Sequence, residues 1–172
     1  MKKLPLWSLI EIKYKNATGW NEFMQNVYKQ IADNLIAWYP EHARDLPWRK
    51  DKEPYHVWLS EIMLQQTRVE AVIGYYDRFL EELPDVQSLA AVSEERLLKL
   101  WEGLGYYNRA RNLQKAAVQI CEQYQGKFPE SYEEWLALPG IGAYTAGAVT
   151  SIAFGKKEAA VDGNVYRIYT RL

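Results

Sequence analysis

The sequence holds one cysteine and almost no net charge, and each shortage excludes a class of protein. Cys121 alone cannot form a disulfide framework or a metal cluster. Lysine and arginine number 21 and aspartate and glutamate 22, which gives a formal net charge of −1. That balance argues against a basic protein that coats nucleic acid, although a local phosphate-binding face needs only a suitable distribution of charge.

Long apolar runs are missing as well. No stretch approaches the roughly 20 apolar residues that a membrane helix needs, so we expect no membrane partner. The apolar N-terminal run 4–10 is interrupted by Pro5 and has no small-residue cleavage site, which argues against a signal peptide. We therefore expect a reducing, cytoplasmic compartment, in which Cys121 is a buried small hydrophobic residue.

Patterns that favour strands are weak throughout, and there is no fixed-period repeat or low-complexity segment. Apolar residues recur instead at the spacing of amphipathic helices, which predicts an all-α fold. Ser93, Ser131 and Asp162 precede such stretches and are expected as N-caps. Helices are expected over 27–38, 54–65, 69–80, 94–104, 108–124 and 145–154, with a short helix after Ser131, a last helix after Asp162 and a loop over 40–48.

Residues 138–147, Leu-Pro-Gly-Ile-Gly-Ala-Tyr-Thr-Ala-Gly, form the most informative segment. Gly140 and Gly142 can adopt positive φ and allow close approach of another molecule, while Ile141 anchors the turn in the core. The amides after Gly142 would open a helix, and a helix N-terminus binds anions such as nucleic-acid phosphates. Such hairpins also occur in ligases, polymerases and repair accessory proteins, so the segment indicates DNA binding without specifying a reaction.

Two acidic residues are candidates for chemistry. Glu61 lies in an apolar helical turn, where it is either a solvated surface residue or a partly buried one. Burial would raise its pKa and make it a usable acid near neutral pH. Asp162 follows Gly142 by 20 residues and would lie near a bound nucleic-acid backbone. Taken alone, it is also a simple helix cap.

Two polar segments suit a surface that separates stacked bases. The side chains of Gln65, Gln66 and Thr67 can enter a base stack without a charge, or they simply end a helix. The segment 105–111 places tyrosines beside arginines at a helix start, which suits a wedge with phosphate contacts. The other interpretation is a pair of core tyrosines beside solvated arginines.

Together these segments resemble the adenine DNA glycosylases of the endonuclease III superfamily, with a continuous match from about residue 46 to 172. Lyase-type members carry a lysine where this chain has Tyr144, and its amine forms a Schiff base with the sugar. Those members also carry glutamine where Glu61 stands. Both differences imply a monofunctional enzyme that removes adenine. The matching segments are 46–49, 54–55, 57–61, 63–67, 103–107, 109–113, the hairpin and 161–165.

The resemblance implies a role in base excision repair, acting on double-stranded DNA with a flipped adenine that was mispaired with 8-oxoguanine or guanine. Glu61 would protonate the adenine and later activate water. Asp162 would stabilise the cationic sugar as a carboxylate, directly or through a covalent step. Tyr144 and Asn164 would line the site near both acids. The residues implied to bind substrate are Trp48, Arg49, Gln65, Gln66, Thr67, Tyr106, Leu138, Gly140 and Gly142.

The resemblance also implies a helix-hairpin-helix glycosylase fold. A six-helix barrel domain is expected over 41–160, with the hairpin at 138–148. Residues 1–40 and 161–172 would belong to an incomplete second helical domain, the cluster domain. Relatives bind a 4Fe–4S cluster through four cysteines beyond the last motif here, so we expect no cofactor bound by this chain and a cluster only in a longer parent protein.

The last helix has no glycine or proline terminator, so we expect a truncated chain, the alternative being a helix that ends the protein naturally. The stripe Val27, Ile31, Leu35 and Trp38 should then be incompletely covered. We expect a monomer in the bacterial cytoplasm, associated with the nucleoid. Two alternatives stay open: a bifunctional glycosylase/AP lyase, and a non-catalytic DNA-binding fragment that uses the hairpin alone.

Overall fold

A computed structural model describes residues 18–171, with side chains from residue 25 onward, so the N-terminal run 4–10 lies outside the described residues. The chain divides into two compact units between Arg44 and Asp45. Every regular element in the described part is helical and none is a strand, which confirms the all-α prediction. The further division at 160/161 stays a prediction.

The first unit contains helix α2 (Thr18–His42), which is longer than expected. The expectation of a loop from Pro40 is wrong, because the helix continues for two residues beyond it. A proline this close to the C-terminus removes little of the hydrogen-bond ladder, and the amide of Ala43 still reaches the carbonyl of Tyr39 at 2.8 Å. Leu35 and Trp38 are exposed, as expected for the incompletely covered stripe, whereas Val27 and Ile31 are half-buried.

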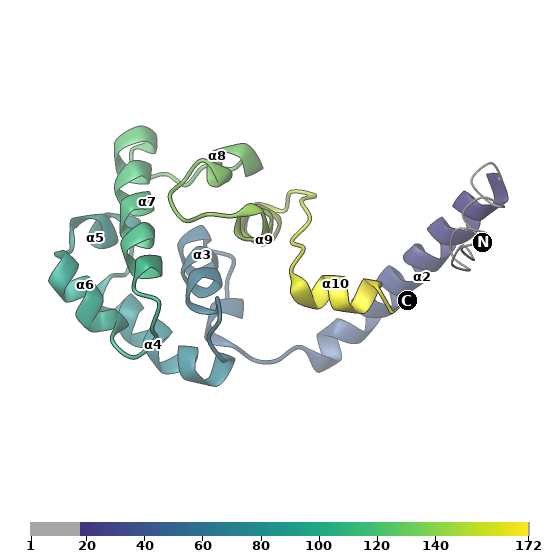
Figure 1. The fold of residues 1–172 in the computed structure, drawn as a ribbon, viewed down its shortest axis with the longest axis horizontal. Coiled ribbons are helices and arrows are strands. Elements are labelled where there is room, and N and C mark those ends of the chain that lie inside the picture. Colours follow the sequence, from purple (N-terminus) through teal and green to yellow (C-terminus); the bar gives the residue numbers. More distant parts are fainter. Residues whose placement is uncertain (1–17, 172) are drawn as a thin grey trace, which may run out of the picture. The chain divides into compact units, whose positions relative to one another are not determined.

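The second unit is a helical body around α3 (Pro54–Met63), which contacts α4, α7 and α9 (Figure 1). Seven of the ten residues of α3 are buried, so this helix forms the centre of the core. The remaining elements are the 3-10 helix η1 (Pro47–Arg49), α4 (Val69–Glu82), α5 (Val86–Ala91), α6 (Glu94–Trp101), α7 (Asn108–Tyr124), α8 (Tyr132–Leu136), α9 (Ala143–Phe154) and α10 (Gly163–Tyr169).

Local capping explains where several of these helices begin. Ser93 accepts a hydrogen bond from the amide of Arg96 at the start of α6, and Ser131 forms a capping box with Glu134 at the start of α8, as expected. Sequence reasoning missed α5, whose six residues are too few to show a helical period. Its signal is another capping box, between Asp85 and Ser88.

Helix α9 is built of small residues, and this composition positions the segment that follows it. A Cβ atom added at Gly147 would lie 2.4 Å from the carbonyl oxygen of Ala159. The chain therefore folds back across α9 at a distance that only glycine allows. This close return leads into Asp162, the N-cap of α10, and into the first turn of that helix, which carries Asn164.

Candidate active site

Glu61 projects from the last turn of α3 and is half-buried, which decides between the two interpretations of its surroundings in favour of partial burial. Burial is the main cause that raises the pKa of its carboxyl above the ordinary value. A hydrogen bond from Tyr144 opposes the rise, the negative charge of Asp162 adds to it, and Arg49 opposes it. Side chains from three separate segments thus act on the Glu61 carboxyl group.

Asp162 is the N-cap of α10. One carboxylate oxygen accepts hydrogen bonds from the amides of Asn164 at 2.9 Å and Val165 at 2.8 Å, and the other accepts from the Asn164 side chain at 2.7 Å. The bond from the Val165 amide is the main cause that lowers the pKa of this carboxyl. Asp162 is therefore a helix cap and, at the same time, an ionised neighbour of Glu61.

Tyr144 lies in the first turn of helix α9 and completes this arrangement. Burial, together with the nearby charge of Glu61, raises the pKa of its phenol to about 12, so the hydroxyl is protonated at neutral pH and donates to Glu61. The structure thus brings Glu61, Tyr144 and Asp162 together, with Asn164 bound to Asp162. A carboxyl with a raised pKa beside one with a lowered pKa can supply a proton donor and an anion at the same pH.

Two residues of η1 were expected to line the same site. Arg49 is exposed, and its charge acts on the Glu61 carboxyl. Trp48 was expected to bind substrate, but its side chain is only 7% exposed. Its ring packs edge-on against Tyr76, with a distance of 5.4 Å between the ring centroids. Arg49 therefore lies within electrostatic reach of the acids, whereas the Trp48 ring belongs mainly to the core.

The expected wedge residues have an unusual backbone. Gln66, which is exposed, has φ of 57°, and Tyr106, which is 64% exposed, has φ of 48°. Non-glycine residues seldom adopt this left-handed region, and such conformations cluster at functional sites. Gln65 and Thr67 flank Gln66 and are half-buried, and the Gln65 amide lies 3.4 Å from the hydroxyl of Thr145 in α9.

Arg109, the first arginine after Tyr106, differs from both earlier interpretations. The guanidinium of Arg109 turns inward and donates to backbone carbonyls of other segments, so it is neither a phosphate contact nor a solvated side chain. Arg111 instead forms an ion pair with Glu94, with an N–O distance of 2.6 Å. Tyr106 and Tyr107 are both exposed, which excludes the interpretation of a pair of core tyrosines.

The hairpin has the expected form except at Gly142. Gly140 has φ of +76°, and a Cβ atom there would lie 2.7 Å from Cβ of Asn112, so this position requires glycine. Gly142 has φ of −98°, so the expectation of positive φ there is wrong: it is the N-cap of α9 in an extended conformation. Leu138 and Ile141 are buried and anchor the hairpin, as expected for Ile141.

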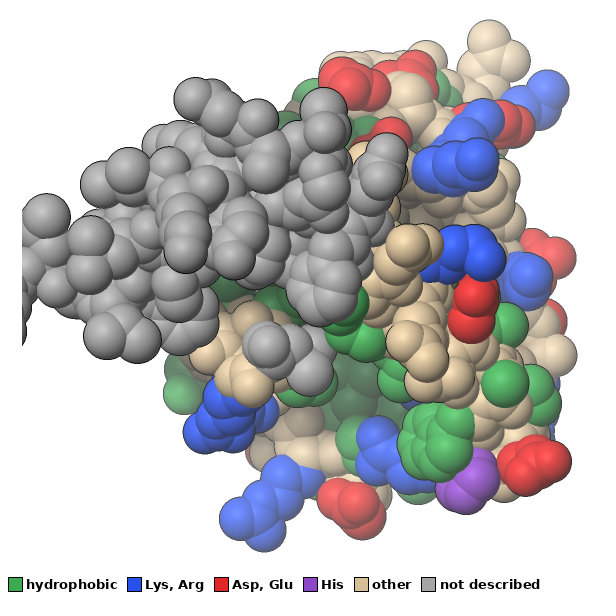
Figure 2. Space-filling model, turned by 90° about the vertical axis from the view of Figure 1, so that its right-hand side faces the viewer, with side chains coloured by type: hydrophobic (Ala, Val, Ile, Leu, Met, Phe, Trp, Pro, Cys, Tyr) green, Lys and Arg blue, Asp and Glu red, His purple; other side chains and the backbone are tan. Residues whose placement is uncertain are grey.

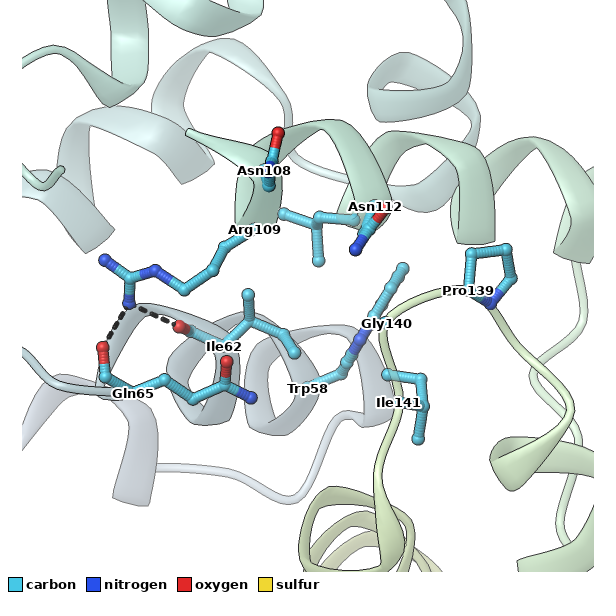
Figure 3. A pocket seen from close by; sticks show the side chains of 10 residues that line it. Trp58, Ile62, Gln65, Asn108, Arg109, Asn112, Pro139, Gly140 and Ile141 are labelled. Carbon is cyan, nitrogen blue, oxygen red and sulfur yellow. Dashed lines mark hydrogen bonds between the residues drawn. The ribbon is translucent and has the colours of Figure 1, made fainter. Parts of the chain in front are cut away.

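A pocket of about 120 Å³ lies between α3, α7 and the hairpin (Figure 3). Its walls include no member of the Glu61–Asp162 pair, so it is distinct from that pair. The buried nitrogens Trp58 Nε1 and Arg109 Nε both belong to lining residues, and within the described part of the chain neither has a hydrogen-bond partner. The lining residues are Trp58, Ile62, Gln65, Asn108, Arg109, Asn112, Leu113, Pro139, Gly140 and Ile141.

Neither a metal site nor a membrane span is found among the described residues. No group of three or more histidine, cysteine, aspartate or glutamate side chains there could hold a metal ion. Cys121 is half-buried rather than fully buried, with its thiol 3.8 Å from the carbonyl of Val86. No helix in that part of the chain is long and apolar enough to cross a membrane.

Comparison with known proteins finds close relatives. The chain is 45% identical to the adenine DNA glycosylase of Rattus norvegicus over 86% of this chain and 31% of that protein. It is also 45% identical to the adenine DNA glycosylase of Buchnera aphidicola subsp. Baizongia pistaciae, over 80% of this chain and 39% of that protein. The chain thus spans about a third of the length of these relatives.

Solved structures match the fold as well. A thermostable thymine-DNA glycosylase matches with a TM-score of 0.79 and 30% identity, over 84% of this chain and 67% of that one. A trapped endonuclease III–DNA covalent intermediate matches with a TM-score of 0.72 and 30% identity, over 84% and 68%. Residues 59–172 match the family described as the HhH-GPD superfamily base excision DNA repair protein. The chain therefore belongs to the HhH-GPD superfamily of base excision DNA repair proteins.

Proposed function

We propose that the protein is a monofunctional DNA glycosylase that hydrolyses the N-glycosidic bond of adenine mispaired with 8-oxoguanine or guanine. The observation that carries the proposal is the meeting of Glu61 and Asp162, with pKa values moved in opposite directions. Tyr144 stands beside them, and its phenol has no amine nitrogen with which to form the Schiff base of a lyase. The named relatives are adenine DNA glycosylases, which agrees with this choice of base.

Binding of DNA comes first in the proposed mechanism. The amides at the N-terminus of α9 would hold a backbone phosphate, since they have no acceptor within the helix. Gln66 and Tyr106 would enter the base stack, and the adenine would be extruded toward the acids. The formal net charge is −1, and basic and acidic side chains are interspersed on the face drawn in Figure 2, so we expect such local contacts to carry the affinity.

Bond cleavage then uses the two acids in different protonation states. Glu61, whose pKa burial raises, donates its proton to the adenine ring, and the bond between the base nitrogen and C1′ breaks with its electron pair leaving on adenine. Asp162 faces the positive charge that develops on the sugar and stabilises it. Glu61, now ionised, accepts a proton from the water that attacks C1′.

A 4Fe–4S cluster takes no part in these steps. Such a cluster needs four ligands, usually thiolates, and this sequence contains one cysteine. The residues of this chain therefore do not fit the cluster, and every proposed step uses side chains or amides of the second unit.

The test is single-turnover adenine release from a duplex with an adenine·8-oxoguanine pair, by the full-length protein that carries this sequence. Glu61→Gln should slow release by about 10²- to 10⁴-fold while duplex affinity changes little. Borohydride should trap no covalent adduct above background, since a trapped adduct would establish a lyase instead. Binding without any base release by the wild-type protein would indicate a DNA-binding module and overturn the proposal.

A further inference from the structure

The Arg109 guanidinium donates its hydrogen bonds to atoms that lie outside its own helix, α7. Arg109 lies in the first turn of α7, and its side chain crosses to the end of α3 (Figure 3). There, Nη1 donates to the carbonyl oxygens of Ile62 at 2.9 Å, Met63 at 3.0 Å and Gln65 at 2.5 Å. The last carbonyls of a helix lack partners in the helical ladder, and Nη1 reaches two of these in α3 and a third carbonyl just beyond the helix end.

The other terminal nitrogen of Arg109 reaches a second segment. Nη2 donates to the hydroxyl of Thr67 at 3.2 Å, to the carbonyl of Leu104 at 3.1 Å and to that of Gly105 at 3.3 Å. One side chain therefore joins the end of α3 to the loop between α6 and α7. We call this set of contacts the arginine clasp.

The arginine clasp holds the residues on either side of the two strained positions. Gln65 and Thr67 flank Gln66, and Gly105 precedes Tyr106, so each left-handed residue is attached to a clasped neighbour. The Tyr106 ring also lies against the guanidinium, at 5.6 Å from its carbon to the ring centroid. Left-handed conformations of such residues persist only where the surroundings over-determine them, and the clasp supplies that constraint.

We propose that Arg109 is a positioning residue for base extrusion, which holds Gln66 and Tyr106 in one preformed arrangement through the arginine clasp. The inference deepens the proposed function, since it concerns the wedge of that reaction. Lysine cannot substitute, because its three donors radiate from one atom, whereas the planar guanidinium reaches two segments from two nitrogens. Burial lowers the pKa of Arg109, in agreement with a cation withdrawn from water for its protein contacts.

The main experiment compares Arg109→Lys with wild-type full-length protein on a duplex that carries fluorescent 2-aminopurine in place of the mispaired adenine. The fluorescence increase on extrusion should fall by about tenfold, and single-turnover adenine release from the adenine·8-oxoguanine duplex should slow by about the same factor. Affinity for undamaged duplex should change by less than about twofold, because the hairpin is intact. The matched control is Arg96→Lys, in which the exposed ion pair with Glu82 is altered and both signals should stay at the wild-type level.

A double-mutant cycle separates positioning from general stability. If Arg109 acts through the wedge, Arg109→Lys should add little to the defect of a Tyr106→Ala variant, so that the two effects are strongly non-additive. Effects that multiply would overturn the inference. Should Arg109→Lys fail to fold, Thr67→Val removes one acceptor of the clasp and should lower extrusion about threefold; an unchanged fluorescence signal in that variant would also overturn it.

Failure of this inference is distinguishable from failure of the proposed function. If wild-type protein extrudes the probe base but releases no adenine, the glycosylase proposal is wrong while the Arg109 comparison stands on fluorescence alone. If wild-type protein releases adenine and Arg109→Lys does so equally fast with an equal fluorescence increase, the positioning role is wrong.

Discussion

The hydroxyl of Tyr144 donates a hydrogen bond to the Glu61 carboxyl, and the two residues shift each other's pKa in opposite directions. The bond lowers the pKa of Glu61 against the larger effect of burial, while burial and then the charge of Glu61 raise the pKa of Tyr144. The hydrogen bond from Tyr144 thus keeps the pKa of Glu61 below the value that burial alone would give. This relationship makes the pH dependence of the proposed reaction testable through residues that surround the acid.

Replacement of Tyr144 by phenylalanine removes the hydrogen bond and leaves the ring. Because that bond stabilises the ionised carboxylate, Tyr144→Phe should raise the pKa of Glu61 further. Reaction requires the protonated acid, so the decline of the single-turnover rate with rising pH should move to higher pH. A pH profile measured with and without the substitution checks this, and a decline that moves to lower pH would contradict the arrangement.

Replacement of Asp162 by asparagine should move the decline of the single-turnover rate with rising pH to lower pH. The negative charge of Asp162 raises the pKa of Glu61, so Asp162→Asn should lower it. Loss of the anion that faces the sugar should also slow adenine release by about 10²- to 10³-fold, judged from the removal of comparable electrostatic groups. Asparagine remains a good N-cap, so α10 should persist, and circular dichroism serves as the control. Wild-type rates in Asp162→Asn would rule out its proposed role.

Burial of Glu61 should cost stability, and the cost should depend on pH. The folded-state pKa of Glu61 lies above the ordinary value of 4.5, so the protonated carboxyl stabilises the folded state fully below that pH. This stabilisation is lost as the pH rises through the folded-state pKa. Glu61→Gln should therefore increase the free energy of unfolding at pH 8, by about 1 kcal/mol, while the gain should shrink toward pH 4. Urea unfolding of the variant and the wild type at both pH values measures this difference in the free energy of unfolding. An equal increase at pH 8 and pH 4 would contradict burial of the Glu61 carboxyl as the cause.

Local patterns predicted those parts of the fold that neighbouring residues determine. Ser93, Ser131 and Asp162 each cap the helix that follows, because a cap depends on a hydrogen bond to an amide two or three residues away. The meeting of Glu61 with Asp162 depends instead on contacts between distant segments, such as the close approach of Ala159 to Gly147. Only resemblance to a family predicted that meeting, since no spacing along the chain encodes it.

Arg109 shows where sequence reasoning must stop. Arg109 and Arg111 lie two residues apart at the start of one helix, and both are typical of a phosphate-binding surface. The structure turns Arg109 toward carbonyls of α3 and leaves Arg111 in an ion pair with Glu94. Backbone carbonyls are the same in every residue, so no side-chain pattern could have identified these acceptors. Gly142 is a similar case, because an N-cap needs no positive φ and glycine fits both conformations.

The proposed contact between the hairpin and a DNA phosphate can be tested by introducing a charged side chain at Gly142. No atom lies within 4 Å of a Cβ atom at this position, and aspartate is a favoured N-cap, so Gly142→Asp should leave α9 folded and as stable as before. The new carboxylate would stand where a DNA phosphate is proposed to bind. Affinity should therefore fall by about tenfold or more for every duplex sequence, paired or mispaired.

The matched control for that variant is Gly74→Asp. Gly74 lies within α4, and a Cβ atom there also meets nothing within 4 Å, so the same charge is added away from the hairpin. Gly74→Asp should change duplex affinity by less than about twofold at moderate salt, because an isolated distant charge is screened beyond about 10 Å. If both variants lose affinity equally, net charge rather than the hairpin governs binding. If neither does, the α9 N-terminus does not contact the phosphate backbone, and DNA must approach the acids from another side.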